Sequence, residues 1–194
     1  KVPPSPPKGR PMEMDEIAAL INSADYHLQA FIIMMIATAA RNKAVLDLTF
    51  DQIDFANGLI DLNPQGREQT HKYRPKVRLP ANIKLWLETA QVLFDCDSVV
   101  QYKGAPVASI RTGWRTLRDR LDLDGDVQPY GIRHTMARWL RMSGVPPWEA
   151  AAQLGHKMPG LSTTEIYAPF DPSYLEKAVQ AIDTFMDELA CEMR

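Results

Sequence analysis

The pattern of apolar and polar positions predicts two helices near the start of this chain. Residues 1–11 are rich in proline and show no apolar period, so they are expected to be extended. From Met14 onward the apolar positions recur at helical spacing, and that helix is expected to stop near residues 22–25. Residues 26–40 are apolar on nearly every face, which predicts a helix at the buried centre of a domain. A short helix or turn is expected over residues 41–50.

A small antiparallel sheet is predicted next. The dipeptide Asn57-Gly58 separates two short alternating runs of apolar residues, and this dipeptide is a strong hairpin signal. A third strand is expected over residues 76–79, directly after the basic stretch 66–75. The three strands together would form a small sheet with a charged loop at its edge.

Helical patterns account for most of the remaining chain, with one small hairpin expected over residues 99–107. The predicted helices span residues 81–93, 110–121, 132–142, 147–154, 162–167 and 173–190. The expected fold class is α+β, mainly α-helical with a small antiparallel three-stranded sheet. We expect residues 1–12 to be a linker from a domain further upstream, residues 13–172 to be a single domain, and residues 173–194 to be a C-terminal amphipathic helix.

The length and the cysteine content narrow the class of protein. The 194 residues suffice for one domain with a hydrophobic core, and no apolar run reaches the length of a membrane span. Cys96 and Cys191 lie far apart without metal-ligand spacing, and no signal peptide is recognisable. We therefore expect a soluble, cytoplasmic protein with no membrane partner.

The charge is unevenly distributed. A net charge of −2 taken alone argues against a nucleic-acid partner, because phosphate neutralisation needs lysine and arginine. Residues 67–84, however, hold six lysines and arginines but only Glu68 as an acid, and further arginines follow from Arg111 to Arg141. One basic face is therefore plausible, although scattered basic residues on solvated helix faces would explain the same counts.

Four segments carry residues that suggest a shared chemistry. They are Arg41 in ATAARNKAVLDL, Arg133 in YGIRHTMARWL, His156 in LGH and Tyr167 in TTEIYAPFDPSYL. With the basic hairpin between the two arginines, these segments resemble the catalytic domain of the tyrosine recombinases, the phage-type integrases, over residues 14–175. The resemblance implies that family's fold and its reaction, in which double-stranded DNA is cut and rejoined through a covalent 3′-phosphotyrosine without metal, ATP or another cofactor. It also implies a core-binding domain upstream.

The resemblance assigns a role to each motif residue. Tyr167 would attack the scissile phosphate, while Arg41 and Arg133 would clamp its oxygens, since guanidinium groups stay protonated and present forked donors. A residue of the hairpin would protonate the departing 5′ oxygen; Lys72 is our choice, with His71 as a competitor. His156 would share the phosphate charge through a hydrogen bond.

Two positions depart from the commoner family pattern. Tyr130 stands where a histidine often precedes the second arginine, and it is a weaker base near pH 7. Ala44 stands where an acidic residue often follows the first arginine, which leaves Asp47 as a guess for that carboxylate. A catalytically weak relative that binds DNA or regulates a partner is therefore the alternative function. Each motif residue taken alone would fit an ordinary structural role; only their joint occurrence favours catalysis.

Further residues are expected to bind DNA or to build the assembly. Arg74, Lys76, Arg111 and Arg115 are candidates for sequence-independent phosphate contacts. The four tryptophans fall among apolar helical positions and are expected in the core. The C-terminal helix either docks on its own domain or, as the resemblance implies, packs on a neighbouring copy and so links a homotetramer on DNA.

Overall fold

The computed structural model describes residues 9–156 and 170–193. Its helices are α1 (Met14–Ser23), α2 (Tyr26–Thr38), α3 (Asn42–Leu46), α4 (Ala81–Leu93), α5 (Arg111–Arg120), α6 (Pro129–Met142), α7 (Pro147–Gln153) and α9 (Glu176–Glu192), with the 3-10 helices η1 (Phe50–Gln52) and η2 (Pro172–Tyr174). The strands are β1 (Ile53–Asp54), β2 (Leu59–Asp61), β3 (Lys76–Arg78), β4 (Gln101–Tyr102) and β5 (Ala105–Pro106). The predicted α+β class, mainly helical with one small three-stranded sheet, is confirmed. The predicted helix 162–167 lies outside the described residues.

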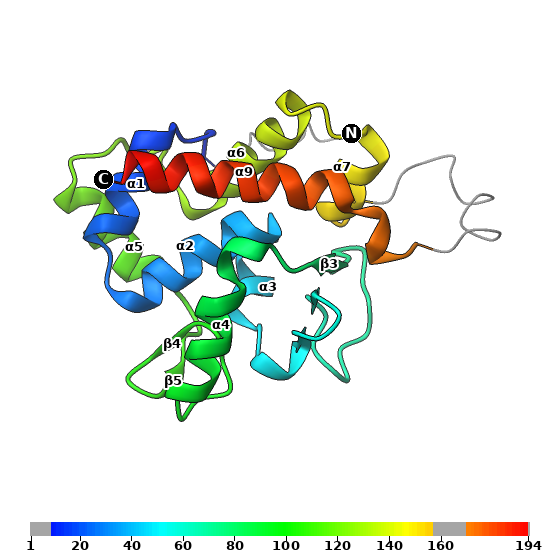
Figure 1. Ribbon diagram of the computed structural model, residues 1–194. Helices are drawn as coiled ribbons and strands as arrows, with labels where there is room; N and C mark the ends of the chain where they lie inside the picture. The colour runs from blue at the N-terminus through cyan, green and yellow to red at the C-terminus, as the bar shows by residue number, and fades with distance from the viewer. Residues whose placement is uncertain (1–8, 157–169, 194) are drawn as a thin grey trace, which may run out of the picture.

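Helix α2 forms the centre of the hydrophobic core. Most of its apolar side chains are buried, among them Phe31, Ile32 and Met35, and α1, α3, α6 and α9 all pack against it (Figure 1). Burial from several sides explains why α2 has apolar residues around its whole circumference. The helix ends at Thr38, and Ala39 follows in a left-handed conformation with a φ of 50°. This ending turns the chain so that Arg41 leaves the core.

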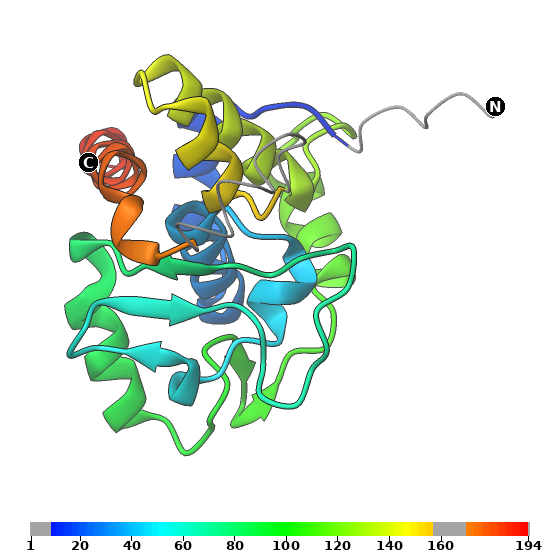
Figure 2. The ribbon, with the colours of Figure 1, turned by 90° about the vertical axis from the view of Figure 1, so that its right-hand side faces the viewer.

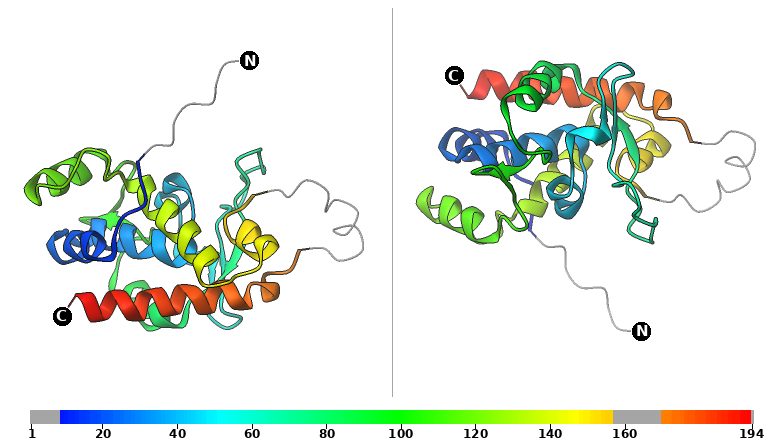
Figure 3. Two further views of the ribbon diagram at one scale, coloured as in Figure 1. Left: turned by 90° about the horizontal axis from the view of Figure 1, so that it is seen from above. Right: turned by 90° about the horizontal axis from the view of Figure 1, so that it is seen from below.

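The sheet lies at one end of the domain, and α5 lies at the other (Figure 3). Its strands run in the order β1-β2-β3, all antiparallel, with Ile60 of β2 opposite both Ile53 and Val77. Figure 2 shows the sheet with η2 beside β3. The predicted hairpin is confirmed: the chain turns between β1 and β2 at the Asn57-Gly58 pair, where Gly58 has a φ of +66°. The small hairpin β4–β5 and the third strand β3 are also confirmed.

Helix α9 packs on its own domain in this structure. It lies along α1, α2, α4, α6 and α7, as Figures 1 and 3 show from two sides. Ile182, Phe185 and Leu189 are buried on the face toward the domain, and the Trp139 indole donates a hydrogen bond to the Ala181 carbonyl at 2.7 Å. Two arrangements were expected for the C-terminal helix. In this structure of a single chain, the helix has the one in which it docks on its own domain.

Several predicted boundaries and positions need correction. Helix α6 begins at Pro129, earlier than predicted, because proline is favoured in the first helical turn. Tyr130 and Arg133 therefore share one helix. Trp114 is buried, and two other tryptophans pack against the core, but Trp148 is 44% exposed, so its predicted core position is wrong. No helix in the described ranges is long and apolar enough to cross a membrane.

The start of the described chain is bound to α6. The Thr135 hydroxyl accepts a hydrogen bond from the Met12 amide at 2.7 Å, and Met12 is buried. Arg10 forms an ion pair with Glu16, which lowers the pKa of Glu16 through that hydrogen bond. Of the segment interpreted as a linker, residues 9–12 thus lie against the helix that carries Arg133.

Candidate active site

Arg133 is a buried cation at the meeting point of two helix ends. Only 4% of the residue is exposed, and its guanidinium donates to the Ala39 carbonyl at 2.6 Å and to the Leu154 carbonyl at 2.7 Å. These carbonyls follow the C-terminal ends of α2 and α7, where backbone acceptors are left free and the helix dipole favours a positive charge. The same guanidinium lies 3.1 Å from Nε2 of His156.

Neither Arg133 nor Arg41, the two arginines of the site, has a carboxylate partner among the described residues. Burial lowers the pKa of Arg133 to about 10; the neighbouring Tyr130 hydroxyl opposes this shift and the charge of Arg41 adds to it. Arg133 therefore remains protonated at neutral pH. A buried charge without a counter-ion is costly, so this position is suited to an anionic ligand.

Arg41 joins the site to the loop between β2 and β3. It precedes α3 in an extended conformation, and its guanidinium donates a hydrogen bond to the Tyr73 carbonyl at 2.8 Å. An ordinary structural role for Arg41 would be to satisfy carbonyls at the end of α2. In the structure Arg133 makes that contact, and Arg41 holds the loop.

His156 follows a tight helix ending. Gly155 has a φ of +64°, and the amides of Gly155 and His156 donate to the Ala152 and Ala151 carbonyls, which is a Schellman motif. A Cβ on Gly155 would lie 2.7 Å from Cδ of Pro75, so only glycine allows α7 to approach the β2–β3 loop this closely. The glycine that directly precedes His156 is therefore a geometric requirement.

The protonation of His156 follows from its neighbours. Partial burial and the charges of Arg133 and Arg41 lower its pKa below the ordinary value, so the imidazole is neutral at pH 7. Because arginine can only donate, Nε2 of His156 accepts from Arg133 and the proton lies on Nδ1. The site therefore contains two cations and one neutral histidine.

Tyr130 lies one helical turn before Arg133 at the rim of the site. Its ring packs edge-on against His134, with ring centroids 5.0 Å apart. Nε2 of His134 is buried without a hydrogen-bond partner among the described residues. Tyr130 also lines a cavity of about 540 Å³ that extends from α3 to α5.

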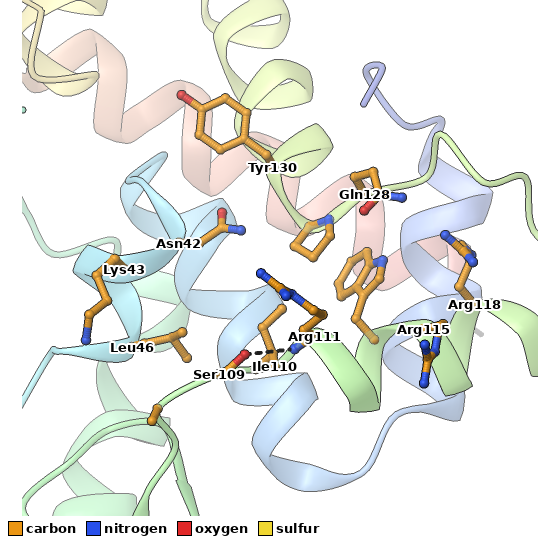
Figure 4. Close-up of a pocket in the computed structure, with 13 residues that line it drawn as sticks. Asn42, Lys43, Leu46, Ser109, Ile110, Arg111, Arg115, Arg118, Gln128 and Tyr130 are labelled. Carbon is orange, nitrogen blue, oxygen red and sulfur yellow. Dashed lines mark hydrogen bonds between the residues drawn. The ribbon is translucent and has the colours of Figure 1, made fainter. Parts of the chain in front are cut away.

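Basic side chains surround this cavity, as Figure 4 shows. Arg111 and Arg115 line it, and Arg111 extends from the start of α5 toward Asn42 on α3. Lys43 and Arg118 line the same hollow, although Arg118 also forms an ion pair with Asp119. Two of the expected phosphate contacts, Arg111 and Arg115, thus share one basic hollow beside Tyr130.

The other two expected phosphate contacts lie elsewhere. Lys76 is exposed on β3, with its Nζ 3.7 Å from the Asp61 carboxylate. Arg74 is enclosed: its side chain is only 10% exposed, and Nη2 forms an ion pair with Asp47 at 2.9 Å. Ala44 is buried in the core, and Asp47, the guess for the carboxylate that the family often has there, pairs with Arg74.

Not every candidate residue is brought to the arginines. His71 and Lys72 are exposed in the β2–β3 loop, and no described contact joins either side chain to Arg41, Arg133 or His156. Tyr167 lies outside the described residues. In the described part of the chain, no three His, Cys, Asp or Glu side chains gather where they could hold a metal ion.

The backbone acceptors of Arg133 are the functional groups that sequence reasoning missed. The carbonyls of Ala39 and Leu154 have no side-chain signature, and they come together only because α2 and α7 end at the same point. Gly155 was the one available hint, since a glycine after a helix indicates a tight ending.

The model of the phage integrase family matches residues 10–173, which include every site residue named above. The chain belongs to the phage integrase family. A tyrosine recombinase XerC from Oceanobacillus iheyensis is 26% identical over 179 residues, which cover 86% of this chain and 55% of that relative. The chain thus spans about half the length of this curated relative.

Solved structures of integrases share the fold. The XerA recombinase superposes with a TM-score of 0.63 at 19% identity, over 98% of this chain and 67% of that one. A lambda integrase dimer bound to a COC′ core site superposes with a TM-score of 0.65 at 13% identity, over 84% of this chain and 49% of that one. The Tn1549 transposon integrase in complex with circular intermediate DNA superposes with a TM-score of 0.61 at 19% identity, over 89% of this chain and 67% of that one. The expected integrase catalytic-domain fold is therefore confirmed.

Proposed function

We propose that this chain is the catalytic domain of a site-specific DNA recombinase, which cleaves and rejoins DNA strands through a covalent 3′-phosphotyrosine at Tyr167. The observation that carries the proposal is the cluster of Arg41, Arg133 and neutral His156, in which two cations meet without a carboxylate among the described residues. A phosphodiester is an anion that planar guanidinium groups bind well. Membership of the phage integrase family supports the same substrate class.

The proposed reaction follows from this charge distribution. The Tyr167 phenol releases its proton to water and attacks phosphorus; an O–P bond forms while the bond from phosphorus to the 5′ oxygen breaks. Arg41 and Arg133 stabilise the charge that grows on the non-bridging oxygens. Lys72 or His71 supplies a proton to the departing 5′ oxygen, which leaves as a hydroxyl. Rejoining is the reverse attack, by a 5′ hydroxyl on the phosphotyrosine.

Double-stranded DNA is the proposed partner along the basic hollow, in the cytoplasmic setting expected from the sequence. Arg111 and Arg115 line the hollow next to Tyr130, one helical turn from Arg133, so a strand bound at the arginines can continue over α5. Lys76 is a further proposed phosphate contact, on the sheet. Binding through these residues is sequence-independent and weakens as salt rises, with about one unit of log–log slope for each phosphate that a basic side chain neutralises.

We also propose that four copies assemble on DNA, with α9 as the contact that the family resemblance implies. In the free chain that helix buries Ile182, Phe185 and Leu189 on its own domain. Assembly through α9 therefore requires the helix to exchange one buried face for an equivalent one on a neighbouring copy. If DNA-bound protein sediments only as a monomer, this part of the proposal is wrong.

A catalytically weak DNA-binding relative is the second candidate. It is favoured by Tyr130 in place of a base, and by the exposed positions of His71 and Lys72 away from the arginines.

Nicked suicide DNA separates the two candidates, because its short leaving strand diffuses away and traps a covalent complex. The recombinase proposal expects a complex that survives denaturation with the unsubstituted chain and none with Tyr167→Phe, while both bind DNA equally. Binding by the unsubstituted chain without any covalent complex would favour the weak relative.

A further inference from the structure

We infer that the Asp47–Arg74 ion pair is a positioning device that fixes the β2–β3 loop, and with it the proton donor of that loop, against the phosphate site. The inference rests on the proposed function. It assigns Arg74 an internal role, in place of the DNA contact expected from its charge.

The pair is enclosed and uses both oxygens of the carboxylate. Arg74 Nη2 lies 2.9 Å from Oδ2 of Asp47, and the side chains are 10% and 26% exposed. Oδ1 of Asp47 accepts from Lys43 Nζ at 2.5 Å, within the same short helix region. Burial alone would raise the pKa of Asp47, but the hydrogen bonds from Lys43 and Arg74 outweigh it and lower the pKa. Asp47 is thus a fixed anion at the end of α3.

The loop is held at three consecutive residues. The Tyr73 carbonyl accepts from Arg41, Arg74 pairs with Asp47, and Pro75 lies against Gly155, where an added Cβ would come within 2.7 Å of it. Arg41 and Asp47 flank α3 on its two sides, so one short helix holds two adjacent loop residues. The loop therefore cannot shift without breaking a contact to an active-site element.

The candidate proton donors directly precede the held residues. His71 and Lys72 are exposed, while the residues from Tyr73 to Pro75 are partly or fully buried. The position of the acid relative to the departing oxygen is therefore set at Tyr73 and Arg74. A misplacement on the order of 1 Å costs about 100-fold in rate when a catalytic group must meet a reacting atom.

Arg74 could pair only with Asp47 or could bind a DNA phosphate, and a lysine at this position distinguishes these two roles. Nη1 is buried and has no hydrogen-bond partner among the described residues. If Arg74 only pairs with Asp47, a lysine at this position keeps the ion pair with its single nitrogen. If the guanidinium fork instead holds a DNA phosphate, lysine is a poor replacement.

The test compares two leaving groups on nicked suicide DNA. One substrate carries the natural 5′ oxygen, which needs an acid; the other carries a bridging sulfur, which leaves as a thiolate because the pKa of a thiol is only about 8.5. We expect Asp47→Asn and Arg74→Gln to slow cleavage of the oxygen substrate about 100-fold and to leave the sulfur substrate within about threefold of the unsubstituted chain. Arg74→Lys should retain most of the rate on both substrates.

A matched control and a readout independent of catalysis accompany the rates. Glu88→Gln removes the exposed Lys84–Glu88 pair on α4, away from the site, and should change neither rate. Trypsin cleavage after Lys72 reports the anchoring directly: Asp47→Asn should accelerate it about tenfold, the change expected when a charge-assisted hydrogen bond is removed.

Three results from the cleavage and binding assays would overturn the inference, and a fourth comes from the trypsin assay. They are equal slowing of both substrates by Asp47→Asn, no slowing of either, and abolished DNA binding in Arg74→Lys. If Asp47→Asn does not fold, the Arg74→Gln and Arg74→Lys pair decides by the same criteria. If the unsubstituted chain cleaves neither substrate, the proposed function fails; an unchanged trypsin rate in Asp47→Asn shows separately that the anchoring is absent.

Discussion

Arg133 and His156 share a hydrogen bond that fixes the charge state of the histidine. Arginine can only donate, so Nε2 of His156 must accept, and the ring stays neutral beside two guanidinium groups. A bound phosphate would reverse these influences, because an anion favours the protonated imidazole. The histidine is therefore expected to take up a proton when DNA occupies the site.

The pH dependence of His156 follows with a definite sign. Its pKa in the folded chain lies below the ordinary value of about 6.5, so the unfolded chain binds the proton first as the pH falls. As the pH falls from about 6.5 to the pKa of His156 in the folded chain, the ionisation of this histidine lowers the free energy of unfolding. Above about pH 6.5 its ionisation does not change the free energy of unfolding.

Proton NMR titration of His156 measures this effect, with His156→Gln assigning its resonance among the four histidines. We expect a pKa below about 6.5 in the free chain and a higher value once nicked DNA is bound. A value at or above about 6.5 without DNA would show that the arginines do not act on this ring as the structure indicates.

Gly155 shows how one helix ending fixes the relation between α7 and the sheet. Its left-handed conformation ends α7, and its missing side chain lets the Tyr73 carbonyl and Pro75 come close. His156 and the loop that carries Lys72 are therefore positioned by the same contact. The contact therefore links the end of α7, which carries His156, to the β2–β3 loop, which carries Lys72.

Substitution of Gly155 by alanine is expected to cost more than backbone strain alone. Gly144 has a similar φ of +72° but open space around it, so Gly144→Ala measures the strain, about 1–2 kcal/mol. Gly155→Ala adds clashes at 2.7 and 2.8 Å, and we expect a further destabilisation of about 1–3 kcal/mol. Urea denaturation of both variants gives the comparison. Equal destabilisation would mean that the close approach to the loop is not required.

Local signals predicted those elements whose structure is decided within a few residues. The Asn57-Gly58 turn and the helix Ala81–Leu93 after Pro80 are predicted correctly, because turn chemistry and apolar spacing are local. Arg74 is misleading, since its charge suggests an exposed side chain and the enclosing Asp47 lies far away in sequence. The acceptors of Arg133 could not be predicted, because backbone carbonyls carry no sequence signature.

Helix α9 packs against most of the helices of its own domain. The helix covers α1, α2, α6 and α7, and Glu149, which is buried on α7, accepts a hydrogen bond from the Ala178 amide near its start at 2.7 Å. A carboxylate at a helix N-terminus is favourable, so this contact fixes α9 relative to the helix that leads to His156. The C-terminal helix is thus part of the core of the free chain.

Removal of residues 173–194 is therefore expected to abolish cooperative folding. The truncation would uncover the residues that pack on Phe185, and removing that side chain alone costs about 3–5 kcal/mol. Thermal unfolding followed by circular dichroism checks this, with Glu192→Ala at the exposed end of the helix as a control. A truncated chain with an unchanged melting temperature would show that α9 is not needed by its own domain.

If Tyr167 is the nucleophile, it becomes covalently joined to DNA, and the attachment site can be read from one peptide. Trypsin releases residues 158–177 as a single fragment that contains both Tyr167 and Tyr174. After reaction with nicked suicide DNA and nuclease digestion, fragmentation by tandem mass spectrometry places the nucleotide on one of the two. We expect a nucleotide linked through its 3′ phosphate to Tyr167; a nucleotide on Tyr174, or an unmodified fragment from DNA-bound protein, would contradict the role of Tyr167 as nucleophile.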